Sequence, residues 1–166
     1  KTFNNPKFFD VVKTWEVTAN RKHHDIVMFK SCFPNSNIAS DEMLGSYKGS
    51  FNSLLPVFRD HPDILFIGMS TPPLAKVSTD HAAASRARAF SRWLTTEYAV
   101  GVRNVAIFDL FDALAIGSGF PDANTLVPRF AVAKGDSHPS SEGARAVVRL
   151  FIPWLNRAIR NAGLSE

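Results

Sequence analysis

The sequence predicts a three-layer α/β domain, in which helices cover both faces of a parallel sheet. Three short apolar runs are continuous rather than alternating, which is typical of strands buried on both faces; they cover residues 25–30, 63–70 and 104–110. Segments with helical periodicity separate these runs. Because strands joined through helices require right-handed crossovers, neighbouring strands are expected to be parallel.

Length and composition predict one domain over residues 1–166. The chain has 166 residues, of which 45% are hydrophobic and 11% aromatic, so it can bury a substantial core. Its single cysteine, Cys32, excludes an internal disulfide. No apolar run approaches the roughly 20 residues of a membrane span. The net charge of +4 is spread over several segments, so we expect no nucleic-acid interface.

Helical patterns follow in order along the chain. Phe8, Val12 and Trp15 indicate a short helix near the start. After the first strand, Ser40 is a suitable N-cap. It precedes an apolar stripe at steps of three and four, formed by Leu44, Tyr47, Phe51, Leu54 and Phe58. Pro56 is expected to kink this helix or to end it early.

Two further helices lie beyond the second and third strands. The stripe of the first consists of Ala83, Ala87, Phe90, Leu94 and Tyr98. On this helix, Arg86, Arg88 and Arg92 are expected to face solvent. The stripe of the second consists of Ala144, Val148, Phe151, Leu155 and Ile159. Residues 111–137 have little periodicity, and a loop of this length in a compact α/β domain is usually functional.

The loop before the last helix contains a candidate catalytic histidine, His138. Ligand sites in parallel α/β sheets form beyond the carboxyl ends of the strands. Pro139 favours an extended backbone at His138, and Ser140 or Ser141 can cap the helix that follows. A carboxylate at Asp136 could orient the imidazole. The alternative is an ordinary turn histidine, since Asp, Ser and Pro are common turn residues.

These segments together resemble the SGNH (GDSL-type) hydrolases. GDSHPSSEGARAVVRLFIPWL, residues 135–155, resembles the family's last motif block, in which an acid and a catalytic histidine precede a proline and the C-terminal helix. DIVMFKSCFPNSN, residues 25–37, resembles the strand and loop that supply an oxyanion-hole asparagine. The segments ILFIGMSTPPL and VRNVAIFDLFDAL resemble the next two strands in the family's order. The resemblance implies a flavodoxin-like α/β/α fold with strand order 2-1-3-4-5.

The resemblance also implies residue roles. His138 would be the general base, Asp136 the orienting acid, and Asn35 or Asn37 an oxyanion donor, with Asn35 preferred because it is nearer the strand. For both asparagines, an ordinary turn is the alternative. The family's acid stands three residues before the histidine, where this chain has Gly135. Other acids, at positions 109 and 112, are therefore alternatives to Asp136.

The family's nucleophilic serine lies in a Gly-Asp-Ser motif after the first strand, and nothing before Asp25 matches that motif. The same letters at 135–137 follow no strand, so we interpret them as coincidental. One hypothesis is that an N-terminal segment outside this chain supplies both the first strand and the serine. The other is that Ser31 is the nucleophile, although it lacks the flanking glycine that such strained turns favour.

The sequence therefore predicts a serine esterase of the SGNH type that acts on a small acyl ester, possibly on a carbohydrate. The alternative is a non-catalytic α/β binding or assembly module that has lost its nucleophile. We expect no cofactor, because no glycine-rich phosphate loop follows a strand. We expect no metal, because no histidine has ligand spacing with cysteine or carboxylates. The expected partner is the N-terminal segment; the isolated chain should hydrolyse esters poorly or not at all.

Overall fold

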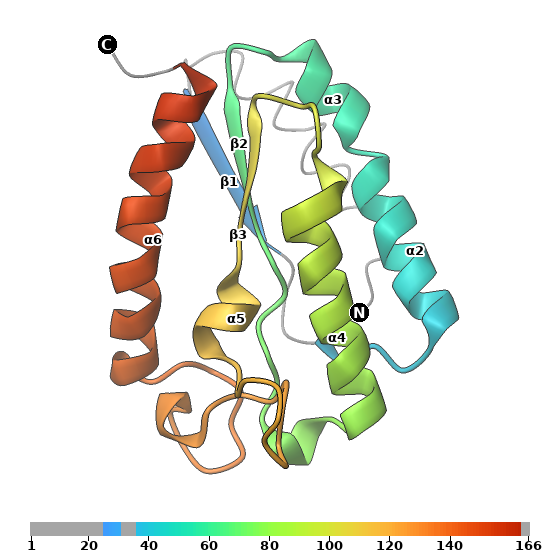
Figure 1. Cartoon of the computed structure of the whole chain (residues 1–166), viewed down its shortest axis with the longest axis vertical. Coiled ribbons are helices and arrows are strands. Elements are labelled where there is room, and N and C mark those ends of the chain that lie inside the picture. The colour runs from blue at the N-terminus through green and yellow to red at the C-terminus, as the bar shows by residue number, and fades with distance from the viewer. Residues whose placement is uncertain (1–24, 31–35, 164–166) are drawn as a thin grey trace.

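A three-stranded parallel sheet forms the centre of the computed structural model, which describes residues 25–30 and 36–163. The strands are β1 (Ile26–Lys30), β2 (Leu65–Met69) and β3 (Val105–Phe108), in the order β1-β2-β3. Lys30 lies opposite Met69, which in turn lies opposite Phe108. The carboxyl ends of all three strands therefore meet at one edge (Figure 1). All three predicted strands are confirmed.

Helices cover both faces of this sheet, as predicted. In Figure 1, α6 lies on one side, and α2, α3 and α4 lie on the other. The helices are α2 (Asp41–Asn52), α3 (Leu55–Asp60), α4 (His81–Trp93), α5 (Leu110–Leu114) and α6 (Ser141–Ala162). A π-helical turn, Leu94–Tyr98, extends α4, and two 3₁₀ turns occupy Lys76–Ser78 and Pro128–Phe130. The predicted short helix at Phe8, Val12 and Trp15 lies outside the described residues.

The helix boundaries follow from local capping chemistry. Ser40 caps α2 by accepting a hydrogen bond from the N–H of Met43 at 3.1 Å. Pro56 lies in the first turn of α3, where its missing N–H costs nothing, so the predicted break is confirmed. At the start of α6, Ser140 is the residue that caps, accepting from the N–H of Gly143 at 3.3 Å.

The larger core lies between the sheet and helices α2–α4 and is rich in aromatic rings. Phe51 packs edge-on against Phe90 and Tyr98, with ring centroids 5.4 and 5.5 Å apart. The hydroxyl of Tyr98 donates to the carbonyl oxygen of Phe51 at 2.6 Å, which satisfies a buried polar group. In β2, Gly68 leaves room for two neighbouring side chains, because a Cβ there would lie 2.5 Å from Ile107 Cδ1 and 3.1 Å from Phe29 Cζ.

The opposite face of the sheet is covered less completely. There α6 packs through Ala158 against Leu65 and Ile67 of β2. Met28 projects from β1 toward this same face but is 49% exposed, and α6 exposes Val148 (55%) and Ile152 (50%). Within the described residues, β1 is also the last strand of the sheet on its side. The β1 edge and the neighbouring flank of α6 thus leave apolar surface exposed.

Two arginines of α4 differ from the prediction that they face solvent. Arg86 donates to Asp41 Oδ1 at 2.7 Å and to the carbonyl oxygen of Ala39 at 3.2 Å. Arg88 pairs with Asp112 and donates to Asn124 Oδ1 at 3.0 Å. The prediction was wrong for both, because the start of α2, the short helix α5 and nearby loop residues return to this face of α4. Arg92, by contrast, is exposed as predicted.

Replacing Gly68 by alanine should lower the free energy of unfolding by about 1–3 kcal/mol, because the added methyl group overpacks the core against Ile107 and Phe29. Gly49→Ala is the matched control. A Cβ at Gly49, in α2, meets nothing within 4 Å, so this change should stabilise the chain by about 0.5–1 kcal/mol. Urea denaturation measures both changes. Equal effects at the two positions would contradict the packing described for β2.

Candidate active site

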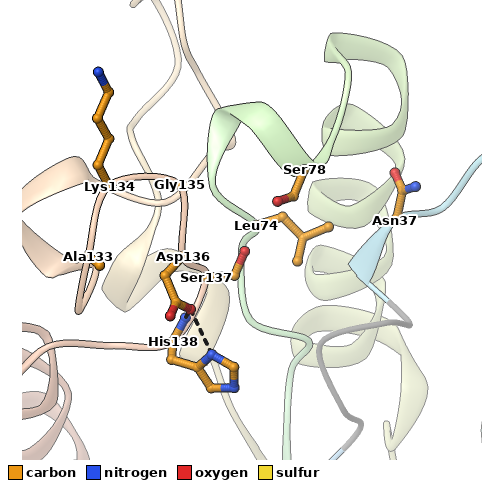
Figure 2. A pocket seen from close by; sticks show the side chains of 9 residues that line it. All are labelled: Asn37, Leu74, Ser78, Ala133, Lys134, Gly135, Asp136, Ser137 and His138. Carbon is orange, nitrogen blue, oxygen red and sulfur yellow. Dashed lines mark hydrogen bonds and ion pairs between the residues drawn. The ribbon is translucent and has the colours of Figure 1, made fainter.

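An open pocket of about 770 Å³ lies at the carboxyl edge of the sheet. It is lined by side chains from three segments far apart in the sequence: Asn37 after β1, Leu74 and Ser78 after β2, and the loop 133–138 before α6. Figure 2 shows Asn37 on one wall and His138 on the other. The fold therefore brings together three predicted site residues, Asn37, Asp136 and His138.

Asp136 holds His138 by two hydrogen bonds to the same carboxylate oxygen. Oδ1 lies 2.7 Å from Nδ1 of the imidazole and accepts the backbone N–H of His138 at 2.8 Å (Figure 2). The second bond folds the side chain of Asp136 forward over the turn. This local turn explains how an acid only two residues before the histidine reaches its ring, despite the departure from the family's spacing of three.

The same contacts keep the acid ionised. The backbone N–H of His138, followed by its ring, holds the pKa of the Asp136 carboxyl below its ordinary value. An ionised carboxylate accepts a hydrogen bond from Nδ1–H, which leaves Nε2 as the basic nitrogen of the neutral ring. The His138 side chain is 70% exposed, so solvent and ligands can reach it.

Backbone hydrogen bonds anchor the loop that carries the histidine. The N–H of Val132 donates to the carbonyl oxygen of His138 at 2.9 Å. The N–H of Ser140 donates to the carbonyl oxygen of Phe130 at 2.6 Å. Ser137 Oγ accepts the N–H of Ala75 at 3.0 Å, tying the loop to the segment after β2. Ser137 belongs to the Gly-Asp-Ser letters at 135–137, and this contact gives it a structural role.

Asn37 is oriented by a hydrogen bond from Thr79. Its Oδ1 accepts a hydrogen bond from Thr79 Oγ1 at 3.3 Å, which leaves the amide nitrogen as the donor of this side chain. The residue before it is held more firmly. The Oγ atom of Ser36 lies 2.6 Å from Oγ1 of Thr71, and both residues are fully buried. This contact fixes the start of the Asn37 segment against the end of β2.

The two alternative acids have structural contacts instead. Asp109 Oδ1 accepts from Ser70 Oγ at 3.1 Å, from Ser91 Oγ at 2.9 Å and from the N–H of Asp112 at 2.9 Å. Asp112 pairs with Arg88. Asp109 therefore caps α5 and satisfies buried hydroxyls, which argues against either residue as the partner of His138.

Several predicted residues lie outside the described part of the chain. Ser31, the alternative nucleophile, and Asn35, the preferred oxyanion donor, both fall in residues 31–35, as does Cys32. Within residues 25–30 and 36–163, no three His, Cys, Asp or Glu side chains are grouped so that they could hold a metal ion. None of the helices described is both long enough and apolar enough to cross a membrane.

The pKa of Asp136 gives a direct test of its pairing with His138. NMR titration of the carboxyl group should find it below the ordinary value in the unmodified chain. His138→Ala should raise it only part of the way, because the ring contact is lost while the backbone N–H remains. Because its pKa is lowered in the folded chain, the Asp136 carboxylate stabilises the fold at any pH above the ordinary pKa of an aspartate. This stabilisation is lost as the pH falls through the lowered pKa. An ordinary pKa in the unmodified chain would disprove the turn.

Removing Asp109 should cost far more stability than removing Asp136. Asp109→Ala takes the acceptor from Ser70, which is 0% exposed, and removes the cap of α5, so the free energy of unfolding should fall by about 1–3 kcal/mol. Asp136→Ala changes a surface loop and should lower the free energy of unfolding much less. Urea denaturation of both variants measures the difference. The reverse order would assign Asp136 the structural role.

Comparison with known proteins adds evidence about the fold. No protein-family model and no curated protein sequence matches this chain. Its structure is similar to the crystal structure of a proposed acylhydrolase from Bacteroides fragilis, with a TM-score of 0.64 and 16% sequence identity. The match covers 91% of this chain and 70% of the other. The chain therefore has the predicted flavodoxin-like α/β/α fold, which it shares with that protein.

Proposed function

We propose that this chain carries the base, the orienting acid and an oxyanion donor of a serine esterase of the SGNH (GDSL) type. The observation that carries the proposal is the His138–Asp136 pair in one pocket with Asn37, at the carboxyl edge of the sheet. The fold shared with a proposed acylhydrolase supports the same broad reaction class.

In the proposed mechanism, Nε2 of His138 accepts the proton of a seryl hydroxyl as the serine oxygen attacks the ester carbonyl carbon. Asp136, still ionised, stabilises the imidazolium that forms. The amide N–H of Asn37 donates to the oxyanion, a contact whose loss costs roughly 3–4 kcal/mol in comparable sites. The imidazolium then protonates the leaving alcohol, and water, activated by the same histidine, releases the acid.

The nucleophilic serine would come from outside residues 25–30 and 36–163. We favour a segment preceding this chain, which would add a parallel strand beside β1 and deliver the serine at the same edge as Asn37. Within the described residues, no strand pairs with the outer side of β1, and the side chains of Met28, Val148 and Ile152 are exposed. Both observations support this arrangement, because an added strand and helix would cover such surface. Ser31, directly after β1, remains the alternative nucleophile.

The proposed substrate is a small acyl ester, possibly carried on a carbohydrate. The pocket is open to solvent, with the side chains of Asn37 and Ser78 on the wall opposite the imidazole and Asp136 beside it. Hydroxyl and amide groups of this kind suit an alcohol with several hydroxyl groups, which needs both donors and acceptors.

The test compares the 166-residue chain with the same chain extended by the segment encoded before Lys1, using p-nitrophenyl acetate as substrate. The isolated chain should turn over poorly or not at all, and the extended protein should be active. In the extended protein, His138→Ala should lower kcat about 10²–10⁴-fold and Asn37→Ala about 10²–10³-fold. The matched control is His81→Ala, since His81 is an exposed histidine at the start of α4 and does not line the pocket.

Labelling with a fluorophosphonate distinguishes the sources of the serine. Robust turnover by the isolated chain, with labelling that disappears in Ser31→Ala, would assign the nucleophile to Ser31 and contradict the need for another segment. An extended protein that resists the probe yet binds a glycan would instead support the non-catalytic α/β binding module.

A further inference from the structure

A second and more enclosed pocket, of about 400 Å³, adjoins the candidate active site. It lies between the 3₁₀ turn after β2 and the long loop between α5 and α6. The two pockets share residues 133–135, the stretch immediately before Asp136. At the 3₁₀ turn, Val77 lines the second pocket and the next residue, Ser78, lines the first. The two pockets therefore adjoin along this stretch, close to the residues that carry the imidazole.

The second pocket presents apolar side chains. They are Val77, Ile116, Leu126, Pro128, Ala131 and Ala133. Several polar groups in its wall already have partners. Thr125 Oγ1 donates to the carbonyl oxygen of Asp122 at 2.7 Å, and Lys76 forms an ion pair with the Asp122 carboxylate at 2.6 Å. The backbone N–H of Leu126 donates to the carbonyl oxygen of Leu74 at 2.8 Å. With these groups satisfied, the pocket is suited to an apolar group rather than to a sugar.

A lysine side chain lies at the boundary of the two pockets. Lys134 lines both of them, and among the described residues it has no ion-pair partner. Figure 2 shows its side chain extending away from the imidazole, so the ammonium group is free to meet an anion only at the outer side of this boundary. Gly135, beside it, has a φ of +82°, and a Cβ there would lie 3.2 Å from Val77 Cγ2, so a larger residue would crowd this boundary.

We infer that the second pocket binds the aliphatic acyl group of the ester, while the open pocket takes the alcohol. The inference rests on the proposed esterase function and specifies its substrate: a polar alcohol esterified with a short aliphatic acyl group, since pockets of about 300–1,000 Å³ hold small ligands. The hydrocarbon chain of the carboxylate product would lie against Val77 and Ile116.

Binding of the free acids butyrate, hexanoate and octanoate to the 166-residue chain tests this inference without catalysis. Methyl-group NMR should detect shifts at Val77, Ile116 and Leu126, and Kd should fall about fourfold for each added methylene. Val77→Asp should weaken octanoate binding at least tenfold. This side chain is 78% exposed, so the substitution leaves the fold intact. Ala131→Phe, which fills the pocket, should have the same effect, whereas Ala82→Phe, an exposed position on α4, should have none.

The outcomes separate this inference from the proposed function. Octanoate that binds in this pocket, in an extended protein that lacks esterase activity, supports the pocket and refutes the function. Esterase activity without octanoate shifts at these methyl groups supports the function and overturns the pocket. A Kd that is independent of chain length, or unchanged in Val77→Asp, also overturns it.

Discussion

The parallel, in-register pairing of three strands is the constraint on which the candidate site depends. Because Lys30, Met69 and Phe108 lie side by side, the segments that follow β1, β2 and β3 all leave the sheet at one edge. Asn37 and Ser78 line the same pocket there, although they are 41 residues apart in the sequence. The loop before α6 closes over the same edge and adds the imidazole. No residue of the pocket needs an unusual backbone to reach it except Gly135, whose positive φ turns the loop.

The acid–histidine contact depends on local geometry as much as on charge. Asp136 reaches Nδ1 because its carboxylate also accepts the backbone N–H of the histidine, which fixes the side chain over the turn. Asp109 has an equally polar environment, but its oxygen is occupied by two serine hydroxyls and a backbone N–H. Two aspartates at the same end of the fold thus have different roles. The hydrogen-bond donors around each carboxylate determine its role.

Much of the fold was predictable because local signals agreed with the tertiary structure. Continuous apolar runs marked the strands, and Ser40, Pro56 and Ser140 marked helix ends. Arg86 and Arg88 were mispredicted, because helical periodicity identifies the buried face of α4 but carries no information on which loops return to the other face.

The site was predictable only in part. The role of Asp136 remained open because spacing along the sequence does not reveal a side chain folding back on its own turn. The second pocket had no recognisable signal, since its apolar residues are scattered through a loop without periodicity. Ser31 and Asn35 stay predictions, because they lie outside the described residues.

The loop that carries His138 is closed at its base by the backbone bonds joining Phe130 to Ser140 and Val132 to His138. Residues 133–135, which line both pockets, lie within this closed loop. The side chains of Ala133 and Lys134 can therefore be exchanged while the bonds at the base of the loop keep the imidazole in place. In the proposed esterase, such exchanges would alter the preference for an acyl group without moving the proposed base.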